Sequence, residues 1–228
     1  MGDKKSKVPS SILRYITIGL MSLTAAFTLL SGVGTTCVAL AAEKFGSMSV
    51  LAPYKWLYMI FVLLTLVVGI LGVRSSIMLI KGRPSAYRSS LLALILGILV
   101  GGAHIIASRR LRGSSMPVDA VVYTTLITLI VFLLLRIPKI RDRVNLEDNN
   151  QKHSDMAGGI SAFVVSGFIL SIQYWMTPSH TIQGTNYANA FQTSLMGIGI
   201  GLGLCGMVLI VRAALSPPPY LKDISVSK

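Results

Sequence analysis

The chain has few acidic residues and long stretches that carry no formal charge. Only 8 of its 228 residues are Asp or Glu, against 21 Lys and Arg. Between Asp155 and Arg212, over 56 residues, no Asp, Glu, Lys or Arg occurs. Because soluble surfaces are about a quarter charged, a soluble domain does not leave so long a segment uncharged. This absence argues against a soluble globular protein and indicates one that lies in a lipid bilayer.

Signatures of enzymes and of cofactor sites are also missing. The sequence contains no P-loop, no GxSxG, no HExxH, no CxxC and no dinucleotide fingerprint. It has two cysteines, Cys37 and Cys205. We place Cys37 near the outer face and Cys205 about 20 Å below it, too far apart for a disulfide. We therefore expect no cofactor and no metal, and we favour a protein that is not an enzyme.

Long apolar runs make up most of the chain, which is 53% hydrophobic. A helix needs about 20 apolar residues to cross the hydrocarbon core, and continuous runs favour helices over barrel strands. We predict an all-α, polytopic helical membrane protein with six transmembrane helices, at about 12–42, 56–80, 87–108, 118–135, 158–177 and 191–214. The first of these resembles a retained signal anchor more than a cleaved signal peptide.

The basic residues predict an orientation. With six spans and a cytoplasmic N-terminus, 16 of the 21 Lys and Arg fall on the inner side. Basic residues in short loops resist translocation, so both termini are predicted to be cytoplasmic. One outer loop opposes the rule, because it contains Arg109, Arg110 and Arg112. Either the third run does not cross fully, or these arginines have a partner such as Asp119, a lipid phosphate or another subunit.

The inner basic residues suit lipid better than nucleic acid, because they are divided among short segments and form no single patch. We expect anionic head groups on the cytoplasmic side to contact one cluster in particular, made of Arg136, Lys139, Arg141 and Arg143. No nucleic-acid partner is expected.

The chain divides into three parts. Residues 1–135 hold four predicted spans, 136–155 form a polar cytoplasmic linker, and 156–228 hold the last two spans with a short tail. Counting spans differently, three and three, would allow an inverted repeat of the kind found in transporters. The two halves show little similarity beyond a glycine-rich third span in each.

Glycine forms the most distinctive local pattern, in the last predicted span. At 100° per residue, two of its glycines share one face and three lie on roughly the opposite face. The first pair is Gly197 and Gly201, and the second set is Gly199, Gly203 and Gly206. Small residues let helices approach closely, which predicts helix packing on both faces, as for a helix in the middle of a bundle. The alternative is a flexible helix that bends during transport or gating.

Polar side chains within the predicted spans are mostly hydroxyls, and no charged residue lies in a span's core. Ion-coupled carriers usually need such charges, so their absence argues against coupling to protons or ions. One weak constellation is predicted at the outer side: His104, Asp119 and His180, with Glu43 and Met176 nearby. Imidazoles and carboxylates at one depth could hold a metal or act as acid and base, although their spacing matches no ligand motif. Ordinary structural roles explain them more simply.

Three functions remain open. The preferred one is an accessory or scaffold subunit that acts through helix packing, with other membrane subunits as partners. The second is a passive channel or carrier for a neutral or lipid-like molecule, which requires a continuous polar path and a cavity at the midplane. The third is a membrane metal protein or enzyme that uses the outer His and Asp residues. The expected location is the plasma membrane or a bacterial inner membrane.

Overall fold

A computed structural model describes residues 10–182, 185–186, 189 and 191–216. Apart from a two-residue β-hairpin, its regular elements are helices. In chain order they are α1 (Ser10–Ala41), the 3-10 helices η1 (Ala42–Lys44) and η2 (Gly46–Tyr54), α2 (Lys55–Ile80), α3 (Ala86–Arg112), α4 (Val118–Leu134), α5 (Pro138–Val144), α6 (Gln151–His180), β1 (Thr181–Ile182), β2 (Thr185–Asn186) and α7 (Gln192–Leu215). The predicted helical class is confirmed.

Five helices of the described chain are long and apolar enough to cross a membrane, namely α1, α2, α3, α6 and α7. They indicate an integral membrane protein. The remaining predicted span, the fourth in chain order, forms α4, which is apolar but has 17 residues. At 1.5 Å per residue it is about 25 Å long, slightly shorter than a hydrocarbon core of about 30 Å.

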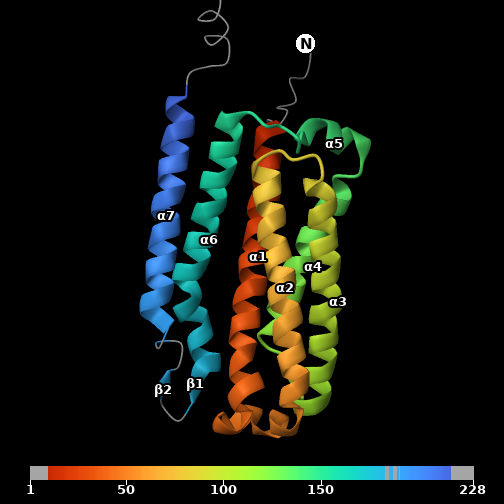
Figure 1. Cartoon of the computed structure of the whole chain (residues 1–228), viewed down its shortest axis with the longest axis vertical. Coiled ribbons are helices and arrows are strands. Elements are labelled where there is room, and N and C mark those ends of the chain that lie inside the picture. The colour runs from red at the N-terminus through yellow and green to blue at the C-terminus, as the bar shows by residue number, and fades with distance from the viewer. Residues whose placement is uncertain (1–9, 183–184, 187–188, 190, 217–228) are drawn as a thin grey trace, which may run out of the picture.

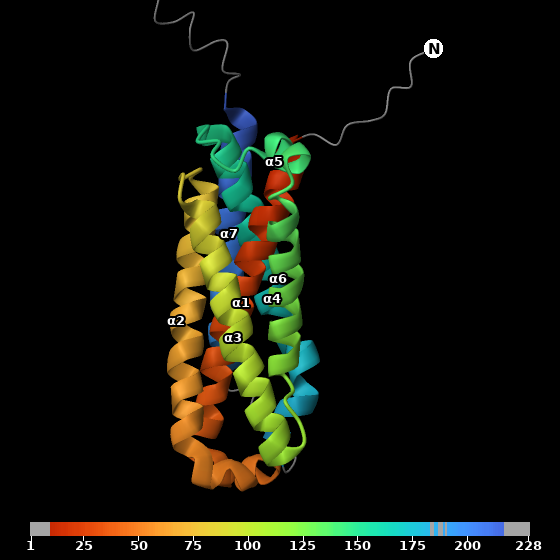
Figure 2. The ribbon, with the colours of Figure 1, turned by 90° about the vertical axis from the view of Figure 1, so that its right-hand side faces the viewer.

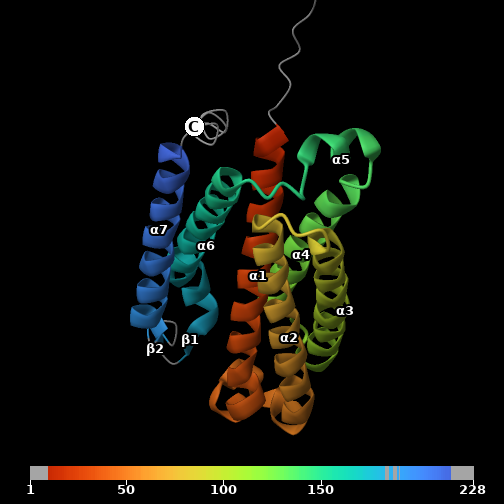
Figure 3. The same ribbon diagram turned by 45° about the horizontal axis from the view of Figure 1, so that its top comes forward.

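The helices run roughly parallel to one long axis, with α1 in the middle (Figure 1). α2, α3 and α4 lie on one side of α1, and the α6–α7 hairpin lies on the other, with α7 outermost. Figure 2 views the side formed by α3 and α4, and Figure 3 shows the same separation from another angle. We call α1–α4 the four-helix group. Its two ends are named the α5 end, where α1 starts and α7 stops, and the η2 end.

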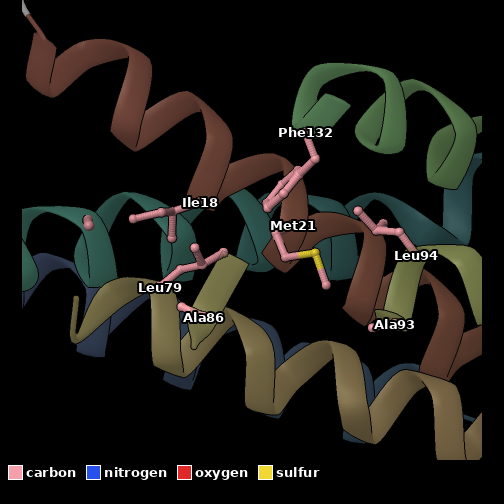
Figure 4. Close-up of a cluster of buried hydrophobic side chains, with 8 residues drawn as sticks. Ile18, Met21, Leu79, Ala86, Ala93, Leu94 and Phe132 are labelled. Atoms are coloured by element: carbon pink, nitrogen blue, oxygen red, sulfur yellow. The ribbon is translucent and has the colours of Figure 1, made fainter. Parts of the chain in front are cut away.

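The main hydrophobic core lies in the half of the molecule near the α5 end. Figure 4 shows its buried side chains, which come from α1, α2, α3 and α4 and include Met21, Leu79, Leu94 and Phe132. Ala157 of α6 belongs to the same cluster. A second cluster, around Tyr58 and Phe61, lies toward the η2 end. α1 contacts α2, α4 and α6, so it is the helix around which the others pack.

The predicted polar linker contains regular structure. Residues 136–155 contain the short helix α5 and also the first turn of α6, which starts at Gln151. Pro138 is at the start of α5, where the backbone N–H that proline lacks would have no hydrogen-bond partner within the helix. The linker folds against the turn between α2 and α3: a Cβ on Gly82, whose φ is +60°, would lie 2.3 Å from the carbonyl oxygen of Asp148. Both the backbone angle and the contact therefore require glycine there.

Candidate functional site

His104, the centre of the predicted outer constellation, is buried in α3 and packs against aromatic rings. Its imidazole stacks on Phe61, with ring centres 4.5 Å apart and planes 10° apart. Tyr58 meets it edge-on at 5.4 Å, and the Tyr58 hydroxyl bonds to Ser108 at 2.8 Å. The ring therefore helps to join α2 to α3.

A small cavity borders His104 inside the four-helix group. Its volume is about 20 Å³. The polar side chains that line it, besides His104, are Thr28, Ser31, Thr65 and Thr125. A cavity needs about 10–15 Å³ and two to four polar partners to hold a water molecule, so this one has room for about one. Hydroxyls and an imidazole provide the hydrogen-bonding partners that such a water requires.

Asp119 is engaged in a network with Arg109 and Ser115. The Arg109 guanidinium donates to one Asp119 oxygen at 2.7 Å and to the Ser115 hydroxyl at 2.9 Å. The Ser115 hydroxyl donates to the other Asp119 oxygen at 2.6 Å. Asp119 is buried in the first turn of α4, where the positive end of the helix dipole also stabilises its negative charge. Both carboxylate oxygens are thus committed to structural bonds.

This network also accounts for part of the arginine cluster that the sequence places, against the positive-inside rule, on the outer side. Asp119, one of the three predicted partners, pairs with Arg109. Arg112 donates to the carbonyl oxygen of Met116 at 2.7 Å. At the same end of the four-helix group, Lys55 pairs with Glu43 at 2.6 Å. Two of the five basic residues predicted at this end therefore have acidic partners within the chain.

The predicted constellation is not assembled as a group of ligands in the part of the structure that is described. Among those residues, no three His, Cys, Asp or Glu side chains lie close enough to hold a metal ion. His104 and Asp119 occupy different packing and ion-pair sites in α3 and α4. His180 ends α6, and its side chain lies outside the described residues, as does most of the outer loop. Cys37 and Cys205 are both free, as expected.

The predicted glycine helix α7 uses one of its two glycine faces against α6. A Cβ on Gly206 would lie 2.9 Å from the carbonyl oxygen of Gly159 and 3.0 Å from Phe163. A Cβ on Gly199 would meet Leu170 at 2.7 Å, and one on Gly203 would meet Ser166 at 3.0 Å. The Ser166 hydroxyl donates to the Gly199 carbonyl at 2.7 Å. The two helices thus approach almost backbone to backbone.

The other glycine face is open. A Cβ on Gly197 or Gly201 would have nothing within 4 Å among the described residues. α7 lies at the edge of the molecule in Figure 1. Only 11% of its apolar 18-residue stretch is buried, against 44% of the corresponding stretch of α1. The expectation of a helix in the middle of the bundle is therefore wrong within this chain. The reason is that one glycine face packs on α6, while no described residue of the chain covers the second.

The sequence did not reveal the roles of two charged groups at the α5 end: Arg14 was counted only among the basic residues of the inner side, and Asp155 only as the last residue of the polar linker. Arg14 is buried, and it donates to the carbonyl oxygens of Leu79 and Ile80 at 3.3 Å and of Asp148 at 2.6 Å. It thereby joins α1 to the end of α2 and to the linker. Its position within the first turns of a long helix was the only signal in the sequence.

Asp148 connects the linker to α6. Its carboxylate pairs with Arg14 and with the His153 ring, and it accepts a hydrogen bond from the Asn150 backbone N–H at 2.9 Å. Partial burial alone would raise the pKa of Asp148. The Asn150 N–H, the His153 ring and the Arg14 guanidinium outweigh that effect and hold the pKa below its usual value.

Asp155 connects α6 to α7. It is buried, and it accepts hydrogen bonds from Arg212 at 2.8 Å and from Gln151 at 2.6 Å. The predicted head-group residues Arg136 and Lys139 are exposed at the same end. The side chains of Arg141 and Arg143, in α5, lie outside the described residues.

No known protein family, curated protein or solved structure matches the chain. Its function is therefore inferred from the contacts described above.

Proposed function

We propose that the protein is a non-enzymatic, multi-pass membrane subunit, accessory or scaffolding, that associates with another membrane helix through α7. The observation that carries this proposal is the asymmetry of α7. Gly199, Gly203 and Gly206 pack on α6, while Gly197 and Gly201 meet nothing in the described chain. In a bilayer, close packing between helices replaces the hydrophobic effect as the driving force, so an open glycine face suits a helix partner.

The proposal includes six spans with α4 as the fourth. α3 ends at the η2 end and α5 lies at the opposite end (Figure 1), so the chain between them has to traverse the bundle. A slight local thinning of the bilayer or the tilt of neighbouring helices accommodates a 17-residue helix. An even number of spans also agrees with the start of α1 and the end of α7 lying at one end.

The α5 end is proposed to be cytoplasmic, which puts both termini inside. Exposed basic residues of the short segments at this end, such as Lys81, Arg83, Arg136 and Lys139, support this orientation. At the η2 end, Glu43 and Asp119 offset Lys55 and Arg109. Anionic head groups are the proposed partners of Arg136, Lys139, Arg141 and Arg143, in a plasma membrane or a bacterial inner membrane.

Passage of a neutral solute is less well supported by the geometry. The hydroxyl-lined cavity beside His104 has about 20 Å³, room for one water molecule and not for a larger solute. The third hypothesis receives no support from His104 and Asp119, because aromatic packing and an ion pair occupy these side chains.

Cysteine chemistry on α7 tests the proposed association. Cys205 is exposed and lies four residues after Gly201, hence on nearly the same face. In native membranes, with Cys37 changed to Ser, we expect alkylation of Cys205 by a membrane-permeant maleimide to be slow. Gly201→Leu should accelerate it by displacing the partner helix.

Gly102→Leu provides the matched control, because Gly102 also has nothing within 4 Å but lies on α3. It should leave the alkylation rate of Cys205 unchanged. Oxidative cross-linking of Cys205 to itself would identify the partner as a second copy of the chain. Equal alkylation rates in all three proteins, with no cross-linked product, would contradict the proposal.

A further inference from the structure

An apolar groove runs along α2 on its outward face. It has a volume of about 340 Å³, and its lining is almost entirely apolar. The residues that form it are Leu29 of α1 and Ile70, Val73, Arg74, Ile77 and Met78 of α2. Other faces of α2 are already used: Ser75 bonds to Ser89 of α3 at 2.7 Å, and a Cβ on Gly72 would meet Ala25 of α1 at 2.9 Å. The groove therefore belongs to the face that is left for lipid or for a partner.

Arg74 is the one charged side chain in this groove. It is exposed and lies six residues before the end of α2, about 9 Å along the axis from the α5 end. Seven residues further, on the same face of the helix, Lys81 is exposed at the C-cap. The groove thus has one cation within it and a second one where α2 ends.

Neither cation has an acidic partner among the described residues. Asp148 is occupied by Arg14 and His153, and Asp155 is occupied by Arg212. A charge at the depth of Arg74 is costly in a bilayer unless the side chain extends toward the head groups and meets an anion there. The arrangement therefore calls for a negative group between Arg74 and Lys81, together with an apolar extension toward Leu29.

We propose that this groove binds one acidic phospholipid, with its phosphate between Arg74 and Lys81 and an acyl chain along Ile70, Val73 and Leu29. Leu29 packs beside Gly69, further from the α5 end than Arg74. The groove therefore extends from Arg74 toward the bilayer centre, which is the direction that an acyl chain takes. A zwitterionic lipid would bring its own cation close to Lys81. Charge complementarity therefore selects a lipid whose head group carries net negative charge.

Lipid retention by the full chain tests this site. The protein is reconstituted in nanodiscs that contain equal amounts of phosphatidylglycerol and phosphatidylcholine. It is then released into mild detergent, and the retained lipids are counted by native mass spectrometry. We expect the wild type to retain phosphatidylglycerol preferentially. Arg74→Gln should weaken that retention about fivefold, the effect of one basic residue near an anionic surface.

Three further variants and a competition with phosphate separate specific binding in the groove from general attraction of anionic lipid. Val73→Trp fills the groove without changing charge and should also weaken retention, whereas Arg74→Lys should preserve most of it. Arg110→Gln removes an exposed arginine at the η2 end and should have no effect. Inorganic phosphate in excess should not displace the lipid, because the acyl chain contributes to binding.

The site would be refuted by equal retention of the two lipids, by equal effects of Arg74→Gln and Arg110→Gln, or by displacement with phosphate alone. The inference rests on the membrane insertion contained in the proposed function, but not on the α7 partner. Loss of lipid selectivity in Arg74→Gln and accelerated alkylation in Gly201→Leu are separate results, so either idea can fail without the other.

Discussion

The four-helix group and the α6–α7 hairpin both combine hydrogen bonds with close contacts at glycine, as at Gly72 and at Ser166, but they differ in which of the two prevails. In the four-helix group, side chains span the space between helices: Thr24 bonds to Thr128 at 2.7 Å, and Tyr87 donates to the Phe132 carbonyl at 2.8 Å. In the hairpin, glycines bring the backbones of α6 and α7 together, most closely at Gly159 and Gly206. The first arrangement depends on bonds that can be removed one at a time. The second depends on the absence of side chains, which any substitution would undo.

The largest expected effect comes from inserting a side chain between α6 and α7. Gly206→Leu should destabilise the hairpin by about 1–3 kcal/mol, because the backbone of Gly159 cannot move aside as a flexible side chain could. Gly201→Leu, on the open face of the same helix, should change the stability of the purified protein little. Unfolding in mixed micelles with increasing SDS measures both. Equal loss in the two variants would show that the glycines matter for helix flexibility rather than for packing.

A smaller effect is expected from the hydroxyl pair in the four-helix group. Thr24→Val and Thr128→Val each remove one partner of the same hydrogen bond, while the shape of the side chain is kept. Hydrogen bonds between membrane helices contribute about 0.6 kcal/mol on average, so each single change should cost about that much. In the same SDS titration, the double variant should cost less than the sum. Strict additivity would mean that the two hydroxyls do not stabilise each other.

The smallest effect concerns the linker that joins the two regions, and it depends on pH. Because the folded protein holds the pKa of Asp148 below its ordinary value of 3.8, the carboxylate stabilises the fold above about pH 3.8. That contribution is lost as the pH falls further, through the folded pKa. Thermal unfolding in detergent between pH 5 and pH 2 should therefore show a steeper loss for the wild type than for Asp148→Asn. Parallel curves would contradict a structural role for this carboxylate.

The positions of the helices could be predicted from the sequence because the surrounding lipid restricts which segments can span it. A span in lipid has to satisfy its own backbone and has to be apolar along its length, so the runs between charged residues marked the helices. Their predicted limits differ from the observed ones mainly at α6, which begins at Gln151 inside the polar linker. The linker's polarity concealed α5 and this first turn, because Asp148 and Asp155 bond to Arg14 and Arg212 and not only to water.

The candidate sites were less predictable, because they depend on which faces meet. Helical periodicity by itself determined that α7 has two glycine faces, and composition determined that the chain lies in a membrane. Only the tertiary structure decided that Gly199, Gly203 and Gly206 meet α6 while Gly197 and Gly201 stay open. It also decided that Arg14 is buried and that Arg74 faces outward. The physical reason is that residue order fixes the angles between side chains on one helix, whereas neighbours come from packing between segments far apart in the chain.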